Sequence, residues 1–219
     1  MSSNFLEIDN ATFAASKKNK VNDVSLTIKK EGEIVCLLGP SGIGKTTILR
    51  TIAGLQNLQS GKIKLKGKTI SSENYNLEPE KRNIAMCFQD NSLFPHYNII
   101  DNINVGAKRN KNSKFPYSDT DLIKILHLED LKEKFPHEIS AGEAQRVSLA
   151  RSLMSKPDLL LLDEPFSNID QSLKDELQKR IKDILKELNI TTIIVTHDSY
   201  EAFYLGDRCG ILLNQSLKQ

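Results

Sequence analysis

The sequence predicts an α/β fold: a mainly parallel sheet with an antiparallel β subdomain and an inserted α-helical subdomain. Apolar runs of strand length alternate with amphipathic helical stretches around residues 33–55 and throughout 158–214, which is typical of a parallel sheet covered on both faces. Residues 1–35 and 62–70 alternate apolar and polar residues, as an antiparallel sheet with one solvated face does. Residues 90–154 read as mostly helical and separate the two halves of the parallel core.

The individual elements follow from these patterns. The predicted strands are FLEI (5–8), VSLTI (24–28), EIVCLLG (33–39), KIKLK (62–66), NIAMCF (83–88), DLLLLD (158–163), TTIIVTH (191–197) and CGILLN (209–214), and the predicted helices are residues 45–55, 172–188 and 199–206. We therefore expect a single domain over residues 1–219. Its core is formed by 1–89 and 155–219, with a helical subdomain at about 90–154. The basic stretch at 108–119 is interpreted as a solvated surface loop.

Composition limits the classes of function. The chain has 219 residues, of which 39% are hydrophobic, and its 30 basic and 28 acidic residues leave a net charge of +2, which gives no electrostatic case for a nucleic-acid partner. No segment approaches the ~20 apolar residues of a membrane span, and the N-terminus lacks the pattern of a secretory signal. Cys36, Cys87 and Cys209 stand singly in apolar runs, as reduced thiols of cytoplasmic proteins do. We expect a cytoplasmic protein that binds no nucleic acid.

Residues 39–46, GPSGIGKT, match the G-x-x-x-x-G-K-[ST] pattern between a predicted strand and a predicted helix. The predicted phosphate-binding residues are Gly39, Pro40, Ser41, Gly42, Ile43, Gly44, Lys45, Thr46 and Thr47. Glycines let successive N–H groups point at phosphate. Lys45 would reach the β- and γ-phosphates, Thr46 would ligate Mg²⁺, and Thr47 would add a hydroxyl to the α-phosphate. The sequence therefore predicts binding of a nucleoside triphosphate.

Polar residues follow the other predicted core strands at the same edge of the sheet. Asp163 and Glu164 end one strand, and we expect Asp163 in the Mg²⁺ shell and Glu164 as the general base for water. His197 ends the next strand, where it would bond the γ-phosphate or orient the water. Gln89 follows a third strand and would sense Mg²⁺ or water, with ordinary loop hydrogen bonding as its alternative role.

The stretch ISAGEAQRVSLARSL, residues 139–153, opens with Ser140 and Gly142 and then becomes a helix-forming run. A helix start carries free N–H groups and partial positive charge. These residues are therefore compatible either with ordinary capping or with a seat for an anion.

Six motifs in order resemble the ATP-binding subunits of ABC transporters over essentially the whole chain: GPSGIGKT, Gln89, ISAGEAQR, LLLLDEP, SNID at 167–170, and VTHD. The resemblance implies an ATPase that uses ATP and Mg²⁺ and forms a homodimer on ATP binding. ISAGE is similar to the family signature LSGGQ, which contacts the γ-phosphate of ATP held by the other subunit. The resemblance therefore implies that Ser140, Ala141, Gly142 and Glu143 contact ATP held by the other subunit. It also implies that Asp170 lies at the interface between the two subunits.

The chain departs from the family pattern at three positions. Ala141 replaces a glycine, which adds a methyl group near the phosphate and restricts positive φ, so we expect a weaker but functional signature. Glu143 replaces glutamine, as in many members. Ala15 stands where the family usually has an aromatic residue stacked on adenine, and Phe13 is the expected substitute, two residues away on the same strand face.

Residues 88–103, FQDNSLFPHYNIIDNI, resemble a segment of importers for ferric iron, polyamines, thiamine and sulfate. In these families the segment receives the coupling helices of the membrane subunits. We expect an exposed aromatic cluster at Phe94, Pro95, His96 and Tyr97, and the alternative is local packing of the helical insert. Larger members of this branch carry a C-terminal regulatory β-domain, which we expect to be absent.

The resemblance thus implies an ATP-hydrolysing importer subunit on the inner face of the cell membrane. Its partners would be integral membrane permease subunits and, indirectly, an extracytoplasmic solute-binding protein. Ferric iron is the first candidate cargo, with thiamine and polyamines next. The alternatives are an ABC exporter or lipid-extraction ATPase, or a soluble ABC-type ATPase of DNA repair or translation, which usually carries coiled-coil or zinc insertions. A P-loop kinase or GTPase would leave ISAGEAQR and SNID unexplained.

Overall fold

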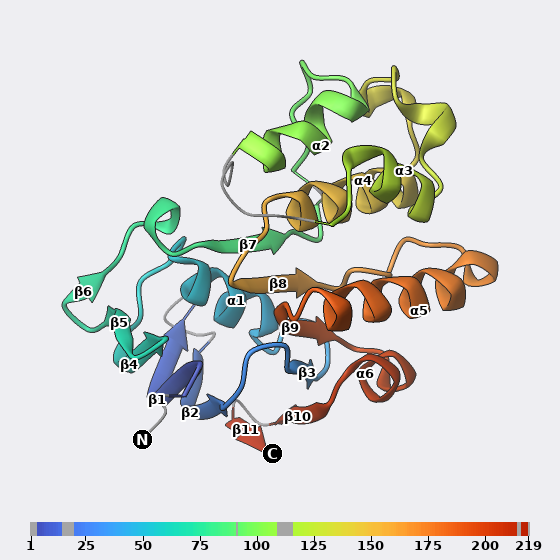
Figure 1. Ribbon diagram of the computed structural model, residues 1–219. Coiled ribbons are helices and arrows are strands. Elements are labelled where there is room, and N and C mark those ends of the chain that lie inside the picture. Colours follow the sequence, from blue (N-terminus) through green and yellow to red (C-terminus); the bar gives the residue numbers. More distant parts are fainter. Residues whose placement is uncertain (1–3, 15–19, 91, 109–115, 214–215, 219) are drawn as a thin grey trace.

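Two sheets form the framework of the computed structural model, which describes residues 4–14, 20–90, 92–108, 116–213 and 216–218 (Figure 1). The antiparallel sheet has the order β2–β1–β4–β5–β6 and comprises β1 (Leu6–Ala14), β2 (Lys20–Ile28), β4 (Ser60–Leu65), β5 (Lys68–Ser72) and β6 (Tyr75–Asn76). The second sheet has the order β11–β10–β3–β9–β8–β7 and comprises β3 (Ile34–Leu38), β7 (Ile84–Cys87), β8 (Leu159–Asp163), β9 (Thr191–Thr196), β10 (Arg208–Leu213) and β11 (Ser216–Lys218). Its strands are parallel except for β11, which pairs antiparallel with β10.

Helices cover both faces of the parallel sheet. They are α1 (Lys45–Ala53), α2 (Ile99–Lys108), α3 (Asp119–Ile125), α4 (Ala141–Met154), α5 (Gln171–Glu187) and α6 (Ser199–Leu205), with short 3-10 turns at Pro79–Lys81, Glu129–Leu131 and Pro136–Glu138. The apolar side of α1 packs in one buried cluster with β1, β2 and β4, and the same cluster includes one face of the parallel sheet. The other face packs with α4, α5 and α6. Figure 1 shows α2 and α3 beside α4, beyond β7.

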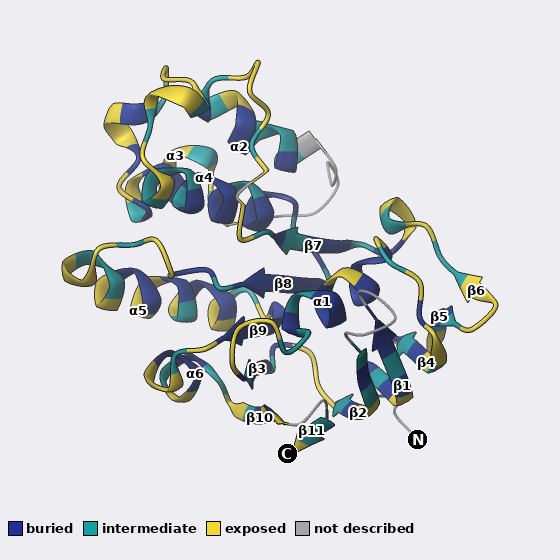
Figure 2. Ribbon diagram, turned by 180° about the vertical axis from the view of Figure 1, so that it is seen from behind, coloured by how far each residue is buried: buried dark blue, intermediate teal, exposed yellow. Residues whose placement is uncertain are grey.

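The run LLLLD explains this layering, because every residue of β8 is buried (Figure 2). Successive side chains of a strand point to opposite faces. Leu159 and Leu161 accordingly join the cluster around α1, whereas Leu160 and Leu162 join the cluster of the other helices. A strand covered on both faces has no polar side, which is why it reads as a continuous apolar run.

The eight predicted strands and three predicted helices are all present, and the antiparallel arrangement of the N-terminal sheet is confirmed. Three strands, β5, β6 and β11, were not among the predicted strands. β6 and β11 are runs of two and three residues, which carry no usable periodicity, and β5 begins inside the predicted antiparallel region 62–70 without having been separated from the strand at 62–66. The subdomain boundaries at about 90 and 154 stay a prediction, because one apolar cluster runs from α2 and α4 into β7 and β8. Within the described ranges, no helix is both long and apolar enough to cross a membrane.

Candidate nucleotide-binding site

The loop between β3 and α1 takes its shape from two glycines with left-handed backbone. Gly42 has φ +79° and Gly44 has φ +110°. A Cβ at Gly44 would lie 2.4 Å from Cγ2 of Val21, whereas a Cβ at Gly42 would meet no atom within 4 Å. Glycine is therefore needed for conformation at position 42, and for both conformation and close packing at position 44. The resulting turn leads directly into the N-terminus of α1.

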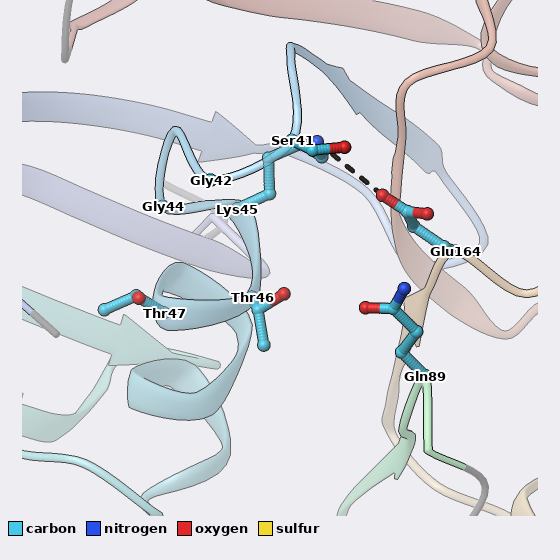
Figure 3. A pocket seen from close by; sticks show the side chains of 8 residues that line it. All are labelled: Ser41, Gly42, Gly44, Lys45, Thr46, Thr47, Gln89 and Glu164. Atoms are coloured by element: carbon cyan, nitrogen blue, oxygen red, sulfur yellow. Dashed lines mark ion pairs between the residues drawn. The ribbon is translucent and has the colours of Figure 1, made fainter. Parts of the chain in front are cut away.

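Lys45 places a buried ammonium group inside this loop. Its Nζ donates hydrogen bonds to the carbonyl oxygens of Gly39 at 2.6 Å and Pro40 at 3.1 Å, and it lies 3.8 Å from Oε1 of Glu164 (Figure 3). Burial lowers the pKa of Lys45, and the carboxylates of Glu164 and Asp163 act in the opposite direction. A single cation thus faces the acidic end of β8 across the pocket.

Asp163 and Thr46 bring two oxygen ligands to the same place. Asp163 ends β8 with 2% of its surface exposed, and Oγ1 of Thr46 lies 3.2 Å from its Oδ1. Burial raises the pKa of Asp163, while the hydrogen bond from Thr46 opposes that shift. Gln89 faces Thr46 from the opposite side of the pocket (Figure 3). Hydroxyl, carboxylate and amide oxygens are the ligands that Mg²⁺ prefers, so these residues fit that ion.

Glu164 has an uncommon backbone conformation for its residue type, with φ +49°. Its N–H donates to the carbonyl oxygen of Val195 at 2.9 Å. Its Oε2 lies 3.2 Å from Nδ1 of His197, whose side chain is 55% exposed. The structure therefore brings the three predicted catalytic residues, Lys45, Glu164 and His197, together at one edge of the sheet.

The N-terminus of α4 is closed by a reciprocal capping box. The Oγ of Ser140 accepts a hydrogen bond from the N–H of Glu143 at 3.2 Å, and Oε2 of Glu143 accepts one from the N–H of Ser140 at 2.7 Å. That hydrogen bond from Ser140 lowers the pKa of Glu143. Ala141 is exposed, begins the helix and does not have positive φ, so the backbone restriction predicted there is wrong. The first helical position requires only ordinary helical φ, which any L-residue adopts.

Apart from Gly39, Pro40 and Ile43, the predicted phosphate contacts line two separate pockets of one chain. The first is lined by Ser41, Gly42, Gly44, Lys45, Thr46, Thr47, Gln89 and Glu164, and the second by Ser140, Ala141, Gly142, Glu143, Arg146, Asn168, Ile169, Asp170 and Leu173. Gly142 packs tightly in the second, where a Cβ would lie 2.4 Å from the carbonyl oxygen of Asn168. Asp170 is exposed and starts α5 without capping it through its side chain. The structure thus does not bring Asp170 or the 140–143 segment to Lys45.

Phe13 cannot contact a nucleotide base, so the prediction for this residue is wrong. Its side chain is 0% exposed and belongs to the cluster between the antiparallel sheet and α1. The pairing of β1 with β2 shifts register between Ile8 and Ala11 and again before Phe13, and such irregularities alter which face a side chain occupies. Ala15 lies outside the described residues.

Two features of the site were not predicted. Gln145 on α4 is fully buried and bonds to the backbone of the turn after β8. Lys174 on α5 lies 2.9 Å from Oδ2 of Asp198 and 3.5 Å from Oε2 of Glu201, next to His197. Lys174 lies one turn before Leu177 and Gln178 on the buried side of the amphipathic helix α5, which was a usable sequence signal. Helix α4 buries residues around most of its circumference, so it gave no such signal for Gln145.

A separate, more apolar groove lies between α1, β7, α2 and α4, with a volume of about 670 Å³. It is lined by Ala53, Leu55, Pro79, Glu80, Ile84, Ala85, Met86, Phe88, Ser92, Phe94, Val105, Gly106, Arg151, Ser152 and Ser155. The predicted exposed aromatic cluster is confirmed, since the rings of Phe94, His96 and Tyr97 contact one another and Pro95 is exposed beside them. Of these four residues, only Phe94 lines the groove, with the guanidinium carbon of Arg151 5.4 Å from its ring centroid.

Comparison with known proteins agrees with this geometry. The Fe(3+) ions import ATP-binding protein FbpC of Fusobacterium nucleatum subsp. nucleatum is 41% identical over 209 residues, covering 94% of this chain and 55% of that protein. The putrescine transport ATP-binding protein PotG of Escherichia coli (strain K12) is also 41% identical over 209 residues, covering 94% and 54%. The chain therefore spans about half the length of these relatives.

A solved structure shares the fold. It is a dimeric ATP-binding cassette in a post-hydrolysis state bound to ADP and Pi, with a TM-score of 0.83 at 25% identity over 98% of this chain and 97% of that one. The family profile of ABC transporters matches residues 21–167, from β2 through the phosphate loop to the turn after β8. The chain therefore belongs to the ABC transporter family and has the fold of its ATPase cassettes.

Proposed function

We propose that this chain is the ATP-hydrolysing subunit of an ABC importer. The observation that carries the proposal is the convergence of Lys45, Glu164 and His197 beside a glycine-shaped loop that opens a helix. The loop supplies N–H groups for phosphate, and Lys45 supplies a cation that is already desolvated. Glu164 supplies a carboxylate that points into the same pocket.

Hydrolysis then follows from the positions of these side chains. Glu164 accepts a proton from water as the water oxygen bonds to the γ-phosphorus and the bond to the β-phosphate oxygen breaks, giving ADP and phosphate. His197 orients Glu164 through the 3.2 Å contact. Thr46, Asp163 and Gln89 would hold Mg²⁺, which when bound neutralises charge on the phosphate oxygens. Lys45 exchanges its bonds to Gly39 and Pro40 for the β- and γ-phosphates.

The active unit of this proposal is a homodimer. Ser140, Ala141, Gly142, Glu143 and Asp170 would contact ATP bound at the phosphate loop of the second copy. Two facts support this: these residues form a pocket of their own, and the related cassette is dimeric. The partial positive charge of the helix start would favour a partner's phosphate at this position. On this proposal, the start of α4 both carries a capping box and contacts an anion, so the two interpretations of this segment are compatible.

The groove at Phe94 would receive integral membrane permease subunits, with the chain peripheral on the inner face of the cell membrane. An extracytoplasmic solute-binding protein would act indirectly, through those subunits. Ferric iron is the first candidate cargo because one relative is named for it, yet a relative of equal identity is named for putrescine transport. The division into a core (1–89, 155–219) and a helical subdomain (about 90–154) belongs to the same proposal.

Phosphate release by the purified chain tests the proposal. We expect ATP hydrolysis that requires Mg²⁺, and we expect Glu164→Gln to lower kcat by about 10²–10⁴-fold, the usual contribution of a general base. The Glu164→Gln variant should still bind MgATP, as measured with a fluorescent analogue. An unmodified chain that releases no phosphate, or a Glu164→Gln variant with normal turnover, contradicts the assignment.

A further inference from the structure

Helix α4 contacts the strand that leads to Gln89, the segment beside Phe94 and the turn after β8. At its start, Ser140 and Glu143 form the capping box. Farther along, Ser148 lies 3.4 Å from the sulfur of Cys87, which ends the strand leading to Gln89. One turn later, Arg151 donates to the carbonyl oxygen of Ser92, beside Phe94. Between the capping box and Ser148, the side chain of Gln145 reaches the turn that contains Glu164.

Gln145 bridges the two ends of the turn after β8. Its Nε2 donates to the carbonyl oxygen of Glu164 at 2.6 Å, and its Oε1 accepts from the N–H of Asn168 at 3.1 Å. The side chain is 0% exposed, so water does not compete for these bonds. A neutral amide is suited to this task, because the turn presents an acceptor at one end and a donor at the other.

The hydrogen bond from Gln145 restrains an unfavourable backbone conformation at Glu164. A non-glycine residue at φ +49° occupies a sparsely populated region, and such conformations persist only where their surroundings restrain them. The restraints here are the bond to Val195, the bonds from Ser167 at 3.3 Å and 3.0 Å, and the bond from Gln145. The direction of the Glu164 side chain depends on this backbone torsion. Gln145 is the restraint that connects it to α4.

We propose that Gln145 is a positioning residue, whose amide fixes the backbone of Glu164 and Asn168 to the helix that begins with the 140–143 segment. It touches neither phosphate nor water, and it acts through Glu164. The general base is then aligned when α4 is seated on the turn and misaligned when the helix shifts. This inference rests on the function proposed above.

The chain offers a matched control that separates the hydrogen bonds of Gln145 from a role in filling space. Gln178 on α5 is also 0% exposed, and neither its amide nitrogen nor its amide oxygen has a hydrogen-bond partner. Gln178→Leu therefore measures the loss of a buried amide alone. Gln145→Leu measures the same loss plus the loss of the bridge.

The test is a cycle of variants in the full chain, with kcat and nucleotide affinity measured for each. Gln145→Leu removes the side-chain acceptor of the Asn168 N–H and leaves the carbonyl oxygen of Glu164 with its bonds from Ser167 alone. This loss should lower kcat about 10- to 100-fold and leave ATP affinity unchanged. Gln178→Leu should change neither. In a Glu164→Gln background, measured by single turnover, Gln145→Leu should lower the residual rate by no more than about 3-fold, because a residue acting through Glu164 has nothing left to align.

The variant Gln145→Glu keeps the test valid if the leucine variant fails to fold. It preserves size and the acceptor for Asn168, but its ionised form cannot donate to the carbonyl oxygen of Glu164. We expect it to lose kcat without losing affinity. Equal losses in both backgrounds, or unchanged turnover in Gln145→Leu and Gln145→Glu, would overturn the positioning role while the ATPase assignment stands. An unmodified chain without ATPase activity would instead overturn the proposed function.

Discussion

At the scale of single residues, the candidate site holds a buried cation and a carboxylate of opposite charge in one small pocket. Lys45 is 5% exposed, and it faces Glu164 at 3.8 Å. Such a cation is already desolvated, so little hydration is lost when phosphate approaches it. The same burial means that removing Lys45 leaves the carboxylate of Glu164 without its cation.

Lys45→Ala should therefore abolish practical nucleotide binding. Charge-assisted hydrogen bonds contribute about 1.5–3 kcal/mol each, so we expect the Kd for MgATP to rise about 100-fold or more. Isothermal titration calorimetry provides the measurement. Lys64→Ala, which removes a half-exposed lysine from β4, serves as the control and should bind normally. Unchanged affinity in Lys45→Ala would place the phosphates elsewhere.

Glu201 makes stability depend on pH. Burial raises its pKa from 4.5 to about 7, although Lys174 opposes the shift. Between these two values the folded chain holds a proton that the unfolded chain has released, so the free energy of unfolding should fall as pH rises from about 4.5 to 7, by up to about 3 kcal/mol in total. Urea unfolding across this range should show a slope that Glu201→Gln lacks. Parallel curves for the two proteins would contradict the assignment.

The sequence correctly placed residues close together where a motif fixes both residue type and spacing. The loop at 39–46 and the acids at 163–164 each follow a predicted strand, and the structure brings them to one edge of the sheet. Their roles toward phosphate and Mg²⁺ stay predictions. Phe13 was misplaced because alternation along a strand does not tell which of its two faces is buried, and Phe13 lies on the face that packs in the cluster with α1. Gln145 could not be assigned a role, since both of its partners are backbone atoms, which carry no sequence signal.

At the scale of elements, the close approach of α4 to the loop before α5 governs the second pocket. Gly142 permits that approach, since any side chain there would meet the carbonyl oxygen of Asn168. Strands were predictable because continuous apolar runs are diagnostic of a covered parallel sheet. The position of α4 against the loop before α5 could not be predicted, because it depends on contacts between segments that are distant in the sequence.

Gly142→Ala should disturb this seating. The added Cβ would lie 2.4 Å from an oxygen atom of the backbone, so α4 or the loop must shift. Overpacking of this kind costs about 1–3 kcal/mol. We expect lower thermal stability together with loss of dimer formation on ATP binding, measured by calorimetry and light scattering. A variant that melts and dimerises normally would show that α4 is not fixed at this point.

At the scale of the whole molecule, the proposed function makes one chain an incomplete unit. Each copy would supply the loop for one phosphate group and the helix start for another, and these two segments line separate pockets of the chain. The γ-phosphate is then the contact that differs between the separate and the closed states, and a ligand shifts an equilibrium only through such a difference.

Light scattering after gel filtration tests this expectation directly. Glu164→Gln with MgATP should change from one subunit of 24.6 kDa to two, because bound ATP is not consumed. MgADP in place of MgATP should leave a single subunit, since it lacks the γ-phosphate. A Glu164→Gln protein that binds ATP yet remains a single subunit would mean that the 140–143 segment does not close the dimer by itself.

The central place of β3 determines the order in which the chain can fold during synthesis. All strands of the antiparallel sheet lie within residues 6–76, so that sheet can form early. β3 must wait for β9 and β10, because Ile34 pairs with Thr192 and Cys209 pairs with Cys36. Pairings over such separations form slowly, since the loop must close before they stabilise it. A nascent chain that stops before residue 191 thus leaves both edges of β3 without a strand partner, and unpaired edges of this kind are suited to binding by a chaperone.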